Sequence, residues 1–130
     1  MSTTDLASLL EPLRVEAERK IREQLSGPKG FGLKFMYDAM MPINLNIAGD
    51  SQECTLKFLA GGDVQLHSGL APSPDVSVKG DLESLRNVIL QRSSSMFDEA
   101  ERNRRIVVTA HSWKGEQAMK KVREILSANP

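Results

Sequence analysis

The side chains that most often carry catalysis or bind metals are scarce in this chain, which contains one cysteine, Cys54, and two histidines, His67 and His111. Zinc-binding and metalloprotease motifs such as C-x-x-C, H-x-H and H-E-x-x-H are absent. Cys54 alternates with the apolar Leu56 and Phe58 and has no basic neighbour on that face to stabilise a thiolate. We interpret it as a small core residue and the histidines as surface residues. We therefore expect no metal, no cofactor and no catalytic group, and an enzyme ranks third among the functions considered.

Glycine-rich segments occur twice, at residues 30–32 and at residues 61–62. A phosphate-binding loop follows a strand and opens a helix at a defined glycine spacing, and neither segment has that pattern. Seventeen basic and seventeen acidic residues give a formal net charge of zero, and only 5% of the residues are aromatic. The one local basic run is Arg102, Arg104 and Arg105. Because the chain lacks both a positive field and stacking side chains, we expect no nucleic-acid binding.

The length suits a single domain that covers residues 1–130 and begins with an amphipathic helix within residues 1–28. No stretch approaches the roughly 20 apolar residues of a membrane span, and the N-terminus lacks the pattern of a secretory signal. One cysteine cannot form an intrachain disulfide, which fits a reducing compartment. These features predict a cytoplasmic protein without a membrane span.

Residues 74–89 form the unit around which the rest of the chain can be placed. Val76 and Val78 share one face of a short strand, and Asp81 is a favourable N-cap for the helix that follows. That helix, to about residue 92, buries a stripe made of Leu82, Leu85 and Ile89. An apolar strand at residues 105–110 comes next. We predict a strand, a right-handed crossover and a second strand parallel to the first.

Leu6, Leu9 and Leu10 fit a turn or two of helix near the N-terminus. Pro12 predicts the start of the first main helix, at residues 12–26, because proline is tolerated in the first turn of a helix and not inside it. The apolar stripe of this helix is Leu13, Ala17, Ile21 and Leu25. Residues 29–41 are largely apolar with two glycines, and they fit either a strand or a short helix. Alternating polar and apolar residues predict a half-buried strand at 43–47.

The hairpin predicted next has a register that follows from its polar and apolar residues. The first strand is apolar at Leu56 and Phe58, and the second at Val64 and Leu66. A two-residue turn would place polar side chains opposite the apolar ones. A loop at residues 60–62, with its last glycine in the left-handed conformation, pairs Phe58 with Val64 and Leu56 with Leu66 instead.

Two further helices are predicted near the C-terminus. Ser95 and Asp98 indicate a capping box for a short helix to about residue 102, and Ser112 is a cap for a final helix to about residue 126. The inward stripe of the final helix is Ala118, Met119, Val122, Ile125 and Leu126. The elements together predict an α+β fold: about five strands in a mixed sheet, with helices packed on one face and the other face solvated.

The second half of the chain resembles the lipid-binding domain of sterol carrier protein 2. The resemblance begins at the hairpin (53–66), continues through residues 74–85, and ends with the strand that Arg105 opens and the helix containing Ala118-Met119-Lys120. It covers about residues 43–126, and the earlier segment matches only in having an amphipathic helix. The family places a glycine soon after its last strand, whereas here His111, Ser112 and Trp113 come first and Gly115 follows.

The resemblance implies a five-stranded mixed sheet with helices on one face and an apolar tunnel between the layers. Such domains carry fatty acyl chains, acyl-CoA or sterols without chemistry. The methionine cluster of Met36, Met40 and Met41 agrees with a lined cavity, because methionine is common at surfaces that accept varied apolar partners, although such residues more often fill an ordinary core.

From the apolar faces of the predicted elements we expect ten residues to line the cavity: Phe35, Met36, Met40, Leu85, Ile89, Phe97, Ile106, Val108, Met119 and Val122. Arg104 and Arg105 are expected at the mouth, where they can meet an anionic head group. The alternative is an interaction module, a homodimer or accessory subunit, whose apolar segment from Phe31 to Met41 packs on a protein.

Overall fold

The computed structural model describes residues 5–27 and 30–126, with the side chains of 30, 31, 125 and 126 left out. The predicted contributions of Phe31, Ile125 and Leu126 therefore lie outside the described side chains. The elements in chain order are α1 (Leu6–Leu25), α2 (Gly30–Met40), β1 (Ile43–Gly49), β2 (Gln52–Phe58), the 3-10 turn η1 (Ala60–Gly62), β3 (Val64–Ser68), β4 (Val76–Gly80), α3 (Leu82–Gln91), α4 (Ser94–Arg102), β5 (Ile106–Ala110) and α5 (Trp113–Leu126).

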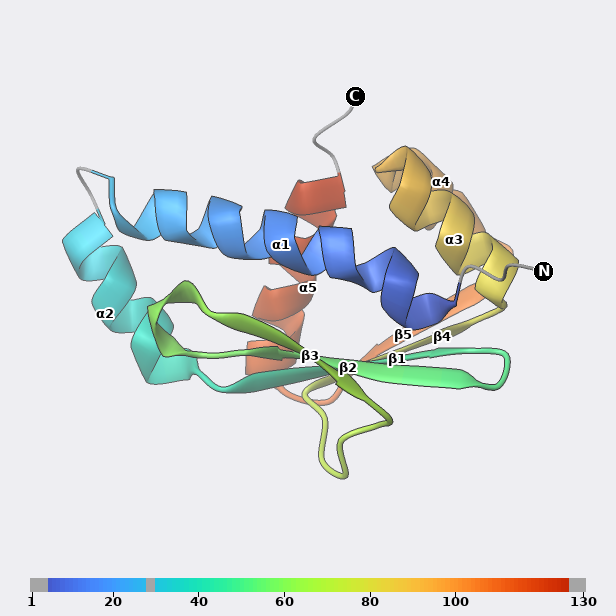
Figure 1. Ribbon diagram of the computed structural model, residues 1–130, viewed down its shortest axis with the longest axis horizontal. Helices are drawn as coiled ribbons and strands as arrows, with labels where there is room; N and C mark the ends of the chain where they lie inside the picture. Colours follow the sequence, from blue (N-terminus) through green and yellow to red (C-terminus); the bar gives the residue numbers. More distant parts are fainter. Residues whose placement is uncertain (1–4, 28–29, 127–130) are drawn as a thin grey trace.

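The described strands form one mixed sheet in the order β3-β2-β1-β4-β5. β1 and β4 are parallel, and the other neighbouring pairs are antiparallel. Figure 1 shows the helices on one side of this sheet, with α2 at one end of the molecule and the α3–α4 pair at the other. The predicted α+β fold is confirmed, and α2 shows that the segment left open at residues 29–41 is helical.

The hairpin of β2 and β3 has the predicted register, with Phe58 opposite Val64 and Leu56 opposite Leu66. Gly61 and Gly62 both have positive φ angles, of 80° and 89°, which glycine adopts without steric cost. The alternation of polar and apolar residues was sufficient to set the register, because a slip of one residue would have moved every apolar side chain to the other face.

The predicted parallel pairing of the strands on either side of the α3–α4 region is wrong, because β4 and β5 are antiparallel. Two helices connect these strands, and the second brings the chain back to the end of the sheet from which α3 departs. Ile106 is accordingly paired with Gly80, and the backbone N–H of Asp81 donates to the carbonyl of Arg105 at 3.3 Å. The parallel neighbour of β4 is β1.

The first helix begins six residues earlier than Pro12 predicted, at Leu6, with the Asp5 carboxylate accepting from the backbone N–H of Ser8 at 2.8 Å. Proline removes one backbone donor, and Pro12 itself is exposed. Burial explains why the helix continues: its stripe of Leu6, Leu9, Leu10 and Leu13 packs on the sheet without interruption.

Side-chain caps define the starts of the later helices. Asp81 caps α3 as predicted, its carboxylate accepting from Ser84 N–H at 2.8 Å. The cap of α4 is Ser93, whose hydroxyl accepts from Met96 N–H at 3.2 Å, so the capping box predicted at Ser95 is wrong by two residues. Both serines precede the same apolar stripe, and the choice between them depends on where the preceding helix ends.

Ser112 and Gly115 place the start of α5 against the sheet. The Ser112 hydroxyl accepts from Gly115 N–H at 3.0 Å and donates to a carboxylate oxygen of Asp75 at 3.0 Å. A Cβ atom on Gly115 would lie 2.0 Å from the Asp75 carbonyl oxygen. Glycine is thus required within the first turn of α5, and not ahead of the helix as the resemblance implies.

The second face of the sheet is solvated as predicted at positions such as Gln65, Lys79 and Thr109, but its centre is covered. Asn46 and Thr55 are only 6% and 4% exposed there. The loop between β3 and β4 passes beneath them on the side away from the helices (Figure 1), and the backbone of Ala71 both donates to the Asn46 side chain, at 3.0 Å, and accepts from it, at 2.9 Å. The loop thereby satisfies polar groups that would otherwise be buried without partners.

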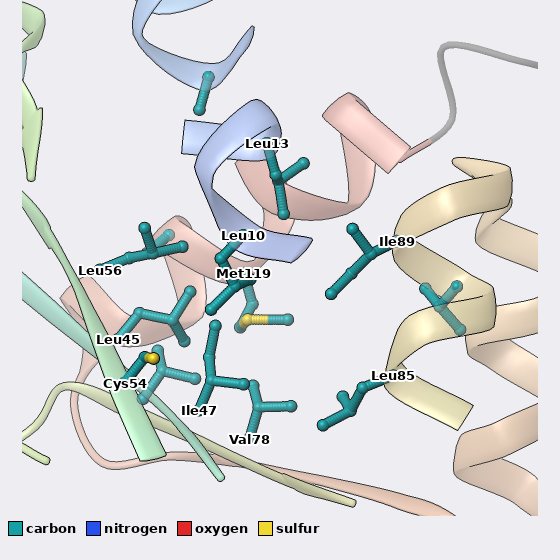
Figure 2. Packing of buried hydrophobic residues seen from close by; sticks show 14 of the residues in the cluster. Leu10, Leu13, Leu45, Ile47, Cys54, Leu56, Val78, Leu85, Ile89 and Met119 are labelled. Atoms are coloured by element: carbon teal, nitrogen blue, oxygen red, sulfur yellow. The ribbon is translucent and has the colours of Figure 1, made fainter. Parts of the chain in front are cut away.

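The hydrophobic core lies between the sheet and the helices. Figure 2 shows Leu10 and Leu13 of α1, together with Leu85 and Ile89 of α3, pointing toward the apolar side chains of the sheet. Polar contacts fix α1 along the edge strand, where Arg14 Nη1 donates to the Val64 carbonyl and the Glu18 carboxylate accepts from the Val64 N–H, both at 2.9 Å.

Candidate functional site

The layer between sheet and helices contains a small apolar hollow, here called the inner cavity, of about 60 Å³. It lies at the centre of the core, where the side chains in Figure 2 converge. Four helices, α1, α3, α4 and α5, and the sheet form its walls. The lining residues are Leu10, Leu13, Ala17, Leu45, Ile47, Leu56, Phe58, Val78, Leu85, Val88, Ile89, Phe97, Ile106, Met119 and Val122. A hollow of this size is far below the volume of an ordinary ligand site.

A larger hollow, here called the outer pocket, has a volume of about 290 Å³. It lies between α2, the C-terminal part of α1, α5 and the end of the sheet where β1 begins and β2 ends. Its walls are Ile21, Gln24, Leu25, Leu33, Met36, Tyr37, Met40, Met41, Ile43, Phe58, Gln117, Ala118 and Lys121. Phe58 is buried and lines both hollows, so its ring lies at the boundary between them.

The polar groups of the outer pocket are few. Lys121 Nζ donates to the Gln24 side chain at 2.8 Å and to the Glu124 carboxylate at 3.0 Å. Burial, with the nearby carboxylates of Asp38 and Asp63, raises the pKa of Tyr37 to about 12. The phenol is therefore neutral at physiological pH and keeps its proton available for donation.

The helix that closes the outer pocket, α2, packs against α1 and the η1 turn. The Asp38 carboxylate accepts from the backbone N–H of Gly61 at 2.8 Å and from Lys34 Nζ at 3.0 Å. The hydrogen bond from Gly61 is the largest cause that lowers the pKa of Asp38. Tyr37 and Met40 are half-buried against the core, whereas much of the rest of α2 is exposed.

The residues predicted to line one cavity lie in four different places. Leu85, Ile89, Phe97, Ile106, Met119 and Val122 line the inner cavity. Met36 and Met40 line the outer pocket. Phe35 is 77% exposed and lines neither hollow, while Val108 lies in an open groove beside α5 that is lined by both charged and apolar side chains. Contact of any of them with a ligand stays a prediction.

Arg104 and Arg105 do not lie at the mouth of the outer pocket. They are exposed immediately before β5, at the end of the sheet where Gly49, Gly80 and Ile106 are paired. The outer pocket lies at the other end, where Ile43 is paired with Phe58. The length of β1 therefore separates the two arginines from the outer pocket.

Sequence reasoning missed several residues of the outer pocket, among them Tyr37 and the α1 residues Ile21, Gln24 and Leu25. The apolar stripe of α1 was recognised, but nothing in the pattern distinguishes the half of a stripe that covers a filled core from the half that borders a hollow. The single tyrosine of the chain, within an otherwise apolar helix, was the available signal.

The one cysteine and the two histidines lie where the sequence predicted, in the core and on the surface respectively. Cys54 is buried, and burial, with a smaller contribution from Asp5, raises the pKa of its thiol. His67 and His111 are exposed and form hydrogen bonds with Gln65 and Ser77, each at 2.9 Å. Within residues 5–27 and 30–126, no group of three or more His, Cys, Asp or Glu side chains is arranged to hold a metal ion.

Among the helices described, none has the length and apolarity needed to cross a membrane.

Comparison with known proteins identifies the fold. No sequence family profile matches the chain, and no curated protein matches it significantly. Among solved structures, the chain is similar to "UbiJ-SCP2 Ubiquinone synthesis protein", with a TM-score of 0.54 and 17% identity over 91% of this chain and 96% of that one. It is also similar to part of the sec-alkylsulfatase Pisa1 from Pseudomonas sp., with a TM-score of 0.50 and 16% identity over 75% of this chain and 14% of the enzyme.

At these identities the likeness establishes a shared fold and nothing beyond it. The sterol-carrier-like, SCP2-like fold expected from the sequence resemblance is confirmed. The chain corresponds to a small fraction of the alkylsulfatase, so that enzyme's activity is a property of a much longer protein.

Proposed function

We propose that the protein binds and carries a lipid in the outer pocket, without chemical change to it. The observation that carries this proposal is a mainly aliphatic hollow of about 290 Å³, at the lower end of the volumes of about 300–1,000 Å³ typical of small-molecule sites. An acyl chain buried there gains about 0.8 kcal/mol per methylene, which makes the chain the main source of affinity. The amide and ammonium groups of Gln24, Gln117 and Lys121 border the same hollow and suit a polar head.

The fold agrees with this proposal. The lipid-carrier function implied by the sequence resemblance belongs to domains in which helices cover one face of a five-stranded sheet, and this chain has that arrangement. Its outer pocket lies between the two layers at the end covered by α2. The α2 side chains on the pocket wall include the flexible Met36 and Met40, which can adapt to the shape of a ligand.

Native mass spectrometry of the purified protein, with solvent extraction of what co-purifies, tests the proposal. We expect a stoichiometric added mass that leaves on denaturation and is identified as an amphiphile. A protein of bare mass that also takes up no fluorescent fatty acid or fatty alcohol contradicts lipid carriage.

A matched pair of variants locates the ligand. Ala118 is buried on the wall of the outer pocket, so Ala118→Phe places a ring inside the hollow and is expected to abolish or strongly weaken uptake. Ala39 is exposed on α2 and does not line the pocket, so Ala39→Phe adds the same ring outside and leaves uptake unchanged. Retained uptake in a folded Ala118→Phe protein would place the ligand elsewhere.

The exposed side of α2 favours a second candidate, an interaction module that docks on a protein or on a second copy of the chain. Leu33, Phe35 and Met36 are 48%, 77% and 64% exposed on this helix. Phe35→Glu separates the two functions, because Phe35 does not line the outer pocket. If α2 is an interaction surface, sedimentation velocity over a range of concentrations shows association of the wild type but not of Phe35→Glu. Lipid uptake, which Phe35→Glu should leave unchanged, is the control.

A further inference from the structure

The hydroxyl of Tyr37 is buried beside the outer pocket and has no hydrogen-bond partner. Among the residues that the structure describes, it is the one buried side-chain nitrogen or oxygen atom in this condition. Buried hydroxyl groups are almost always paired, because losing water without gaining a partner destabilises the folded protein. Tyr37 also forms part of the wall of the outer pocket. An unpaired and buried donor therefore belongs to a residue on the wall of the hollow in which the proposed ligand is carried.

The surroundings of this hydroxyl favour an uncharged partner. The carboxylates of Asp38 and Asp63 are close enough to disfavour the phenolate. Both are already engaged, Asp38 by Gly61 N–H and Lys34, and Asp63 by Arg22. These two carboxylates disfavour a further negative charge beside Tyr37, and Lys121, the cation on the pocket wall, is already hydrogen-bonded to the Glu124 carboxylate. A carbonyl, ester or alcohol oxygen is not opposed in this way. The available interaction is a hydrogen bond from the neutral phenol to a neutral oxygen.

We infer that the ligand of the outer pocket carries an uncharged oxygen acceptor, which receives a hydrogen bond from the Tyr37 hydroxyl while the rest of the ligand packs on the aliphatic walls. This inference rests on the proposed lipid-carrier function and specifies its ligand class: fatty alcohols, esters or ketones rather than free fatty acids or pure hydrocarbons. Tyr37 is then a specificity residue, because it discriminates between chains of the same length by their head group.

Titration of the isotope-labelled protein with octanol, octane and octanoate, followed by the backbone amide signals of α2 and α5, tests the inference. We expect Tyr37→Phe to weaken octanol binding by about threefold to tenfold, the equivalent of one net hydrogen bond. Octane binding is expected to be equal in the two proteins, and octanoate to bind the wild type more weakly than octanol does. Met40→Leu, a change of similar volume on the same wall, leaves the ratio of octanol to octane affinity unaltered.

Each outcome has a separate meaning. Equal losses for octanol and octane in Tyr37→Phe would overturn the role of the hydroxyl while leaving lipid carriage standing. Absence of pocket-specific shifts with every probe would overturn lipid carriage itself. A melting temperature of ligand-free Tyr37→Phe several degrees below that of the wild type would show that the hydroxyl has a partner in the free protein, and the inference would fail. We expect a melting temperature that is unchanged or higher.

Discussion

The inner cavity and the outer pocket both have walls from α1, α5 and Phe58, but they differ in size and in the elements that complete them. The part of α1 up to Ala17 contributes Leu10, Leu13 and Ala17 to the inner cavity, and its last five residues contribute Ile21, Gln24 and Leu25 to the outer pocket. The inner cavity measures about 60 Å³ and is surrounded by buried side chains, whereas the outer pocket measures about 290 Å³. The apolar stripe of α1 thus packs in the core at one end and lines the outer pocket at the other.

The element opposite α1 explains the difference. At the inner cavity α1 faces α3 and the middle of the sheet, whose branched side chains interdigitate (Figure 2). At the outer pocket it faces α2, a short helix that contributes methionines and a tyrosine and lies at the end of the molecule (Figure 1). Close packing requires apolar partners on all sides, and α2 at the end of the sheet supplies them incompletely.

Phe58→Ala is expected to have the largest effect, because Phe58 lines both hollows. Loss of the buried ring should lower the free energy of unfolding, measured in urea, by about 3–5 kcal/mol. If the variant folds, its two hollows are joined, and the ratio of dodecanol affinity to octanol affinity should be higher than in the wild type. Phe58→Leu should change stability and this ratio in the same direction by less. Leu45→Ala, which affects the inner cavity alone, should cost about 2–5 kcal/mol without changing the preference for chain length.

Met119→Trp should have an intermediate effect on stability and none on carriage. Met119 is buried at the inner cavity and does not line the outer pocket, so the larger ring overpacks the core at a cost of about 1–3 kcal/mol. Octanol affinity, measured under folded conditions, should stay at the wild-type value. A folded variant that no longer takes up octanol would show that the inner cavity, and not the outer pocket, holds the ligand.

The smallest expected effect concerns the attachment of α2 through Asp38. Because its folded pKa is lowered from 3.8, the stabilising contribution of Asp38 is present above that pH and is lost as pH falls through the folded value. We expect the amides of α2 to exchange with solvent faster below about pH 3.8, with little change in the inner core. Asp38→Asn should show faster exchange at neutral pH and a weaker dependence on acid. An unchanged dependence in the variant would assign the effect to another group.

Local patterns in the chain were sufficient for several features that the structure confirms. The register of the β2–β3 hairpin follows from alternating side chains, since only one pairing keeps Leu56 and Phe58 opposite apolar residues. The Asp81 and Ser112 caps follow from polar side chains that precede apolar helical stripes. Each of these features depends on interactions between residues close together in the chain, which a sequence pattern records directly.

The remaining features depend on the tertiary structure. The direction of β5 depends on how α3 and α4 pack, and the order of the strands places Arg104 far from the outer pocket. Pro12 is tolerated because burial of the leucines around it outweighs one lost hydrogen bond. The division of one apolar stripe between a filled core and a hollow depends on the volume of side chains brought from elsewhere. Which faces are apolar follows from the local pattern of the chain, whereas how completely each face is filled depends on the packing of distant elements.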